Sequence, residues 1–96
     1  MDRQTLETRW LELTRQTLPS VALRRGWPVH LDHCFQRILL DNAVGGFWRD
    51  HIASPAYRNA PEDILARAVD LGEAALAGEA DMATLNTNSL RWRGKL

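Results

Sequence analysis

The segment from His30 to Asn42 constrains the fold most strongly, because it has helical periodicity without a single apolar face. At about 100° per residue, Phe35 and Ile38 fall on one side of a helix, whereas Leu40 falls on the opposite side. A helix with apolar side chains on opposite sides is stable in water only when other elements cover both of them. We therefore predict a central helix that is surrounded by the rest of the chain.

The same segment places polar side chains where a surrounded helix would bury them, namely Arg37, Asp41 and Asn42. Burying a polar group without a partner costs roughly 1–3 kcal/mol. These side chains must therefore either form an internal network or face a ligand. The sequence leaves both interpretations open, and the choice between them decides the function.

The rest of the chain has the periodicity of amphipathic helices, and no segment has the alternating pattern of a half-buried strand. A chain of 96 residues is long enough for one hydrophobic core. We predict an all-α fold in which residues 1–96 form a single domain, a compact bundle of about four main helices plus one or two short helical turns. Helices are expected from Asp2 to about Thr17, from His30 or Asp32 to Val44, from Pro61 to Gly78 and from Asp81 to Trp92, and the candidate segments for the short turns are 21–25, 47–52 and 54–57.

Proline and glycine set the expected ends of these helices. Pro19 is expected to end the first helix, because a proline disfavours the helical conformation of the residue before it. The pair Gly45-Gly46 is expected to end the central helix. An alternative arrangement is a long helical hairpin that completes its core by forming a homodimer.

Composition and charge exclude several classes of protein. The formal net charge is zero, so the chain has no overall basic field. No apolar run approaches the roughly 18 residues that span a bilayer, and the amino terminus lacks the pattern of a secretory signal. Cys34 is the single cysteine, which permits no internal disulfide and agrees with a reducing compartment. We expect a cytoplasmic protein that has no membrane partner.

A second polar segment, from Leu85 to Lys95, carries functional groups at helical spacing. Asn86, Ser89 and Arg93 are three and four residues apart, so one helix face would present an amide, a hydroxyl and a guanidinium. Such a set is typical of a surface that recognises an anion, and Trp92 would add an apolar wall. We predict that helix 33–43 and segment 85–95 together bind a partner protein or a small anionic ligand. The predicted ligand-binding residues are Arg37, Asp41, Asn42, Asn86, Ser89, Arg91, Trp92 and Arg93.

Catalysis is the competing hypothesis, with His33 or His51 as a base and Cys34 as a nucleophile. His33 and Cys34 point about 100° apart on a helix, so they cannot pair with each other. Cys34 also lies on the apolar face, as a buried structural thiol does. A small group-transfer enzyme would therefore need His51 to reach Cys34 through the fold.

A metal site is a further hypothesis that the histidines raise. His30 and His33 have a usable spacing for metal ligands, with Asp32 between them. Asp41 or His51 would have to complete such a site. A capping aspartate with surface histidines explains the same pattern, and we predict neither a metal nor a cofactor.

Nucleic-acid binding is the third functional hypothesis. An aromatic ring flanked by arginines can stack on a base while the arginines bind phosphates. The segment from Glu62 to Asp81 is predominantly acidic and would repel a polyanion, so nucleic acid is not among the expected partners. The residues that this hypothesis would use are Arg24, Arg25, Trp27, Arg91, Trp92 and Arg93.

Two motifs resemble those of a known family. The pattern HCFxRILLDNAxG spans residues 33–45, LNxxSLxWRGK spans residues 85–95, and Pro55-Ala56-Tyr57 lies between them. Together they look like a family of small uncharacterised bacterial and fungal proteins, sometimes labelled GNAT-type acetyltransferases, and the resemblance covers about two-thirds of the chain. The resemblance implies that the two segments belong to one site, and the label implies group transfer. Such enzymes bind acetyl-CoA on backbone amides between a strand and a helix, whereas the periodicity here predicts no sheet.

Overall fold

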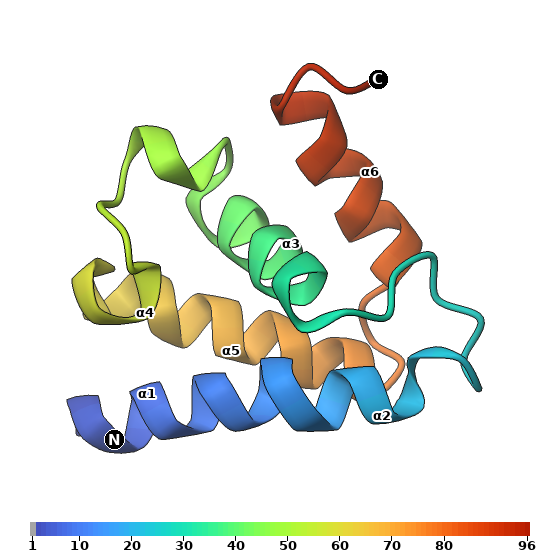
Figure 1. Ribbon diagram of the computed structural model, residues 1–96, viewed down its shortest axis with the longest axis horizontal. Coiled ribbons are helices and arrows are strands. Elements are labelled where there is room, and N and C mark those ends of the chain that lie inside the picture. The colour runs from blue at the N-terminus through green and yellow to red at the C-terminus, as the bar shows by residue number, and fades with distance from the viewer. Residues whose placement is uncertain (1) are drawn as a thin grey trace.

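The computed structural model describes residues 2–96, which form helices joined by short loops, with no strand among them. The all-α fold predicted from the periodicity is confirmed. No helix in the described chain has the length and apolar character needed to cross a membrane. In chain order the elements are α1 (Arg3–Glu12), the π-helical turn η1 (Leu13–Thr17), α2 (Leu18–Ala22), α3 (Asp32–Val44), the 3₁₀ turn η2 (Trp48–Asp50), α4 (Ala56–Asn59), α5 (Glu62–Leu76) and α6 (Met82–Trp92) (Figure 1).

The helices pack around α3, which lies in the middle of the molecule (Figure 1). The elements α1, η1 and α2 follow one another along one side, α5 lies beside them, and α6 covers another side of α3. One hydrophobic cluster takes side chains from every helix, so the chain forms a bundle and not an open hairpin. The prediction of a surrounded central helix is confirmed. Apolar α3 side chains that are at most 2% exposed are Phe35, Ile38, Leu39, Leu40 and Ala43.

The predicted end of the first helix at Pro19 is wrong. The helical path continues to Ala22, and Pro19 lies in the first turn of α2. In a regular α-helix the proline ring clashes with the carbonyl four residues earlier, here that of Arg15. Arg15 belongs to η1, in which the backbone N–H of Leu18 donates to the carbonyl of Leu13, five residues earlier. This wider turn accommodates the proline without ending the helix.

Aspartate side chains cap the amino-terminal ends of α1 and α6. Asp2 accepts a hydrogen bond from the backbone N–H of Thr5 at 2.8 Å, and Asp81 accepts one from that of Thr84 at 3.2 Å. Each carboxylate thus satisfies an amide that the helix itself leaves without a partner. At the other end of α3, Gly45 has a φ of 81°, a left-handed conformation that favours glycine.

Candidate functional site

Asp41, on α3, is the centre of a buried hydrogen-bond network that joins α3, α6 and η2. Its side chain is 0% exposed, and both carboxylate oxygens accept hydrogen bonds. Ser89 Oγ donates to Oδ2 at 2.6 Å, and Arg93 Nε donates to the same oxygen at 2.7 Å. The backbone N–H of Trp48 donates to Oδ1 at 3.0 Å, and Arg93 Nη2 at 3.2 Å. The carboxylate is therefore paired and hydrogen-bonded, as a buried charge has to be.

Arg37, one turn before Asp41 on α3, is held by neutral partners on α6. Arg37 Nη1 donates to Ser89 Oγ at 2.8 Å, and Nη2 donates to Asn86 Oδ1 at 2.9 Å. Ser89 thus accepts from Arg37 while it donates to Asp41. No carboxylate among residues 2–96 forms an ion pair with Arg37, so its positive charge is not neutralised by direct contact there.

Asn42 ties α3 to the first half of α6. Its Nδ2 donates to the carbonyl of Ile38 at 2.8 Å and to that of Leu85 at 2.9 Å. Asn88 Nδ2 donates to Asn42 Oδ1 at 3.2 Å. The amide of Asn42 therefore makes its contacts inside the protein.

The two polar segments meet as the spacing predicted, but protein atoms fill the space between them. Asp41 and Ser89 are each 0% exposed, and Asn42 and Asn86 are half-buried with partners inside the protein. We predicted that these four residues contact a ligand, and none of them is in the lining of the pocket described below. Their polar atoms are used to join α3 to α6, and those of Asp41, Asn86 and Ser89 also hold Arg37 or Arg93.

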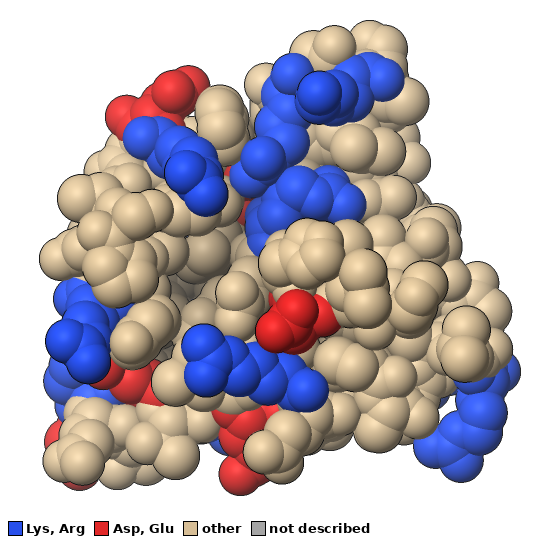
Figure 2. All heavy atoms as spheres, in the orientation of Figure 1, with Lys and Arg blue, Asp and Glu red and all other residues tan. Residues whose placement is uncertain are grey.

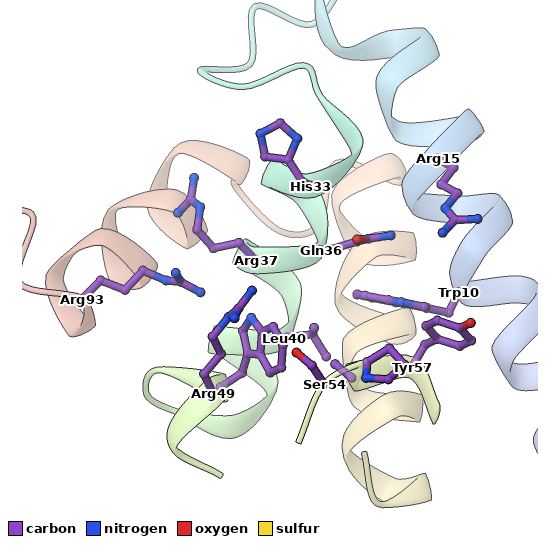
Figure 3. A pocket seen from close by; sticks show the side chains of 13 residues that line it. Trp10, Arg15, His33, Gln36, Arg37, Leu40, Arg49, Ser54, Tyr57 and Arg93 are labelled. Atoms are coloured by element: carbon purple, nitrogen blue, oxygen red, sulfur yellow. The ribbon is translucent and has the colours of Figure 1, made fainter. Parts of the chain in front are cut away.

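A pocket of about 420 Å³ lies beside this network (Figure 3). Its walls come from α1 and η1, from α3, from η2 and from the segment 54–57. Arg37 and Arg93, which the network holds, line one part of it. We call it the arginine pocket, because its lining contains four arginines and no aspartate or glutamate. The arginines are Arg15, Arg37, Arg49 and Arg93.

Three of these arginines share one end of the pocket. Arg49 and Arg93 extend toward each other there, and Arg37 extends from α3 on the same side of the pocket with its guanidinium group turned toward α6 (Figure 3). The guanidinium carbon of Arg93 lies 4.3 Å from the ring centroid of Phe47, and that of Arg49 lies 5.0 Å from the ring centroid of Trp48. Contacts between arginines and aromatic faces are favourable.

The charges of the pocket are open to solvent on one face of the molecule. Arg15 and Arg49 are exposed, and neither makes a side-chain hydrogen bond or ion pair within the described chain. In the space-filling view, basic side chains lie on both sides of a hollow on this face (Figure 2). Asp32 and Asp50 are exposed acidic neighbours along the chain, but they do not line the pocket.

The other end of the pocket has aromatic and amide groups. Trp10, Tyr57 and Gln36 lie there together with Arg15 (Figure 3). Gln36 Nε2 donates to Thr14 Oγ1 at 3.1 Å, and Thr14 Oγ1 donates to the carbonyl of Trp10 at 2.9 Å. Since the hydroxyl of Thr14 uses its proton on Trp10, it accepts from Gln36, and this fixes the orientation of the Gln36 amide. The pocket therefore joins a strongly basic end to an aromatic end.

Two predicted ligand-binding residues lie outside the pocket. Arg91 is exposed, Trp92 is 40% exposed, and neither lines the cavity. The helix α6 turns Ser89 and Arg93 toward α3, which leaves Arg91 and Trp92 at the surface. The apolar wall that we predicted from Trp92 is provided by other aromatic residues, among them Trp10.

The three candidate catalytic residues do not meet in the pocket. His33 is exposed and lines it, with its Nδ1 3.5 Å from Asp32 Oδ1. Cys34 is half-buried and His51 is exposed, and neither is part of the lining. Across residues 2–96, no group of three or more His, Cys, Asp or Glu side chains is arranged to hold a metal ion. Asp41, which was a candidate metal ligand, accepts hydrogen bonds from Trp48, Ser89 and Arg93.

Three residues of the nucleic-acid hypothesis make internal contacts. Arg93 belongs to the Asp41 network. Trp27 packs against Phe35 with ring centroids 5.8 Å apart. Arg25 lies over Trp27 and donates to the carbonyl of Ala75 at 3.1 Å. These contacts give the residues structural roles in joining helices and loops.

Comparison with models of known families, with curated proteins and with solved structures gave no match. The resemblance of the two motifs to a family labelled as acetyltransferases therefore stays a prediction. The chemistry of the arginine pocket is the basis for inferring a function.

Sequence reasoning missed the residues that complete this pocket. Arg15 and Arg49 resemble any other exposed arginine in the sequence, and Trp10 follows the pattern of a core residue. Among these residues, the sequence pointed only to Tyr57 as part of a site, because the triplet Pro55-Ala56-Tyr57 accompanies the two longer motifs. The pocket depends on how η1 and the segment 54–57 pack beside α3, which local spacing does not specify.

Proposed function

We propose that the protein binds a small organic anion in the arginine pocket. The observation that carries the proposal is a concave lining with four arginines and no carboxylate. Guanidinium groups suit anionic oxygens, because their planar N–H donors match carboxylate and phosphate geometry. A volume of about 420 Å³ falls within the range of pockets that hold small molecules.

The network beside the pocket supports a binding role for Arg37 and Arg93. Both guanidinium groups are held by short hydrogen bonds to α3 and α6 residues. Each uses only part of its N–H donors there, so further donors remain for a ligand. Asp41 and Ser89 act as positioning residues in this proposal.

Arg49 and Arg15 have a different role in the proposal. Both are exposed, so their side chains can adjust to a ligand. Arg49 completes the basic end, and Arg15 lies at the aromatic end (Figure 3). The proposal covers binding alone, since Cys34 and His51 do not line the pocket.

The test is calorimetric titration with phenyl phosphate, phenyl sulfate and benzoate at low ionic strength, with phenol as the neutral control. We expect saturable one-to-one binding of at least one anion and none of phenol. The variant Arg49→Gln should weaken that binding about tenfold, because a charge-assisted hydrogen bond is lost without disturbing the fold.

Arg91→Gln is the matched control, because it removes an equal charge from an exposed residue outside the pocket. Its affinity should stay within about twofold of the original protein. Absence of saturable binding for all three anions contradicts the proposal. An equal loss of affinity in Arg49→Gln and Arg91→Gln does so as well, because it would show general charge attraction.

A further inference from the structure

We infer that the arginine pocket recognises the dianionic group of a phosphate monoester with a flat organic part; this inference rests on the proposed function. The observation behind it is the grouping of Arg37, Arg49 and Arg93 at one end of the pocket, with the aromatic groups at the other (Figure 3).

The charge of the basic end matches a dianion. Of its three guanidinium groups, that of Arg93 is paired with a carboxylate, that of Asp41, and Arg37 and Arg49 form no ion pair within residues 2–96. Three positive charges less one negative charge leave an excess of two at this end. A phosphate monoester carries about −1.5 to −2 at pH 7, whereas a carboxylate or a sulfate ester carries a single charge. A dianion therefore neutralises the two excess positive charges of the basic end, whereas a monoanion leaves one of them.

The placement of the three arginines also favours a group with several acceptor oxygens. Arg37 extends from α3, Arg49 from η2 and Arg93 from just beyond α6, so guanidinium groups come to the basic end from three elements (Figure 3). A phosphate monoester presents three strong acceptor oxygens around one atom. A carboxylate presents two oxygens in one plane and matches a single guanidinium best.

The aromatic end suits the organic part of such a ligand. Trp10 and Tyr57 contribute to its walls (Figure 3). A flat ring placed against these side chains would be removed from water while its phosphate stays at the basic end. Inorganic phosphate should consequently bind more weakly than phenyl phosphate, because it leaves the aromatic walls without a contact.

Phenyl phosphate and phenyl sulfate test this inference, because they share size and shape and differ by one charge. We expect phenyl phosphate to bind at least tenfold more tightly at pH 7.5. In Arg49→Gln the excess charge at the basic end falls by one, so this ratio should shrink several-fold. In Arg15→Gln both ligands should lose affinity by the same factor, because Arg15 lies at the other end.

Each outcome separates this inference from the proposed function. Equal affinities for phenyl phosphate and phenyl sulfate overturn the dianion assignment and leave anion binding intact. An unchanged ratio in Arg49→Gln overturns the assignment of the basic end. Equal binding of inorganic phosphate and phenyl phosphate overturns the assignment of the organic part. No binding of any anion overturns the proposed function and this inference together.

Discussion

Replacing Asp41 with asparagine tests whether the buried network holds α3, α6 and η2 together. Asparagine has the same shape but only one acceptor oxygen, and its NH₂ group donates. In one amide orientation the NH₂ group faces the N–H of Trp48 and Arg93 Nη2, and in the other it faces Ser89 Oγ and Arg93 Nε. Either orientation loses accepted hydrogen bonds and removes the charge that balances Arg93.

The magnitude follows from these contacts. Two hydrogen bonds to a charged acceptor are lost, at about 1.5–3 kcal/mol each. Asp41 is 0% exposed and the Arg93 side chain is 18% exposed, so water compensates little of the loss. Breaking a buried ion pair by removing one partner costs roughly 3–5 kcal/mol. We expect Asp41→Asn to lower the free energy of unfolding by about 3–5 kcal/mol and the melting temperature by roughly 12–40 °C.

Urea unfolding followed by tryptophan fluorescence and by circular dichroism measures this loss. Asp70→Asn is the matched control, because Asp70 is exposed on α5 and makes no side-chain hydrogen bond within residues 2–96; its effect should stay within about 0.5 kcal/mol. The double variant Asp41→Asn/Arg93→Gln should lower the free energy of unfolding by less than the sum of the two single variants. The difference should be about 1 kcal/mol or more. If Asp41→Asn lowers the free energy of unfolding by less than about 1 kcal/mol, the reasoning is refuted, because the loss of two hydrogen bonds to a buried carboxylate should lower it by more.

Two further predictions concern the packing of α5 and the start of α6. Gly72→Ala should lower the free energy of unfolding by about 1–3 kcal/mol in the same urea assay. The added Cβ would lie 2.5 Å from Leu13 Cδ2 and 3.1 Å from Leu39 Cδ1, which is too close for normal packing. An unchanged free energy of unfolding would show that these two side chains move aside freely. The hydroxyl and the backbone N–H of Thr84 donate to the Asp81 carboxylate, and these bonds lower the pKa of Asp81 below its ordinary value of 3.8. Because the folded-state pKa is the lower one, the stabilisation is present above pH 3.8 and is lost as the pH falls through the folded-state pKa. The difference in melting temperature between the original protein and Asp81→Ala should therefore shrink on acidification, and a difference that stays constant would contradict this cap.

The sequence predicted the helices well because their signals are local. Asp2 and Asp81 cap the helices that they precede, and Gly45 ends the central one in a left-handed conformation. These features depend on a few neighbouring residues, so spacing and residue type are sufficient to find them. Pro19 was the exception, because the π-helical turn before it relieves the clash that normally ends a helix.

The site was predictable only in part. Polar side chains at helical spacing correctly indicated that Arg37 on one segment meets Ser89 on the other. Spacing does not show whether two such helices leave a cavity between them, because that depends on their distance and crossing angle. Here the helices approach closely enough for direct hydrogen bonds, and the cavity forms on the neighbouring side, where Arg15 and Arg49 complete it.

The proposed binding role gives a reason for the Asp41–Arg93 ion pair in this small protein. A well-packed apolar pair in place of Asp41 and Arg93 would stabilise the fold at least as well. An arginine side chain has up to about 2 kcal/mol of rotamer entropy to lose when a ligand fixes it. For Arg37 and Arg93 much of this entropy is already lost on folding, because Ser89 and Asp41 hold their guanidinium groups. The same bonds that fix the arginines also join α6 to α3. The proposed function therefore predicts that changes at Asp41 weaken both the fold and anion binding, whereas changes at Arg49 weaken binding alone.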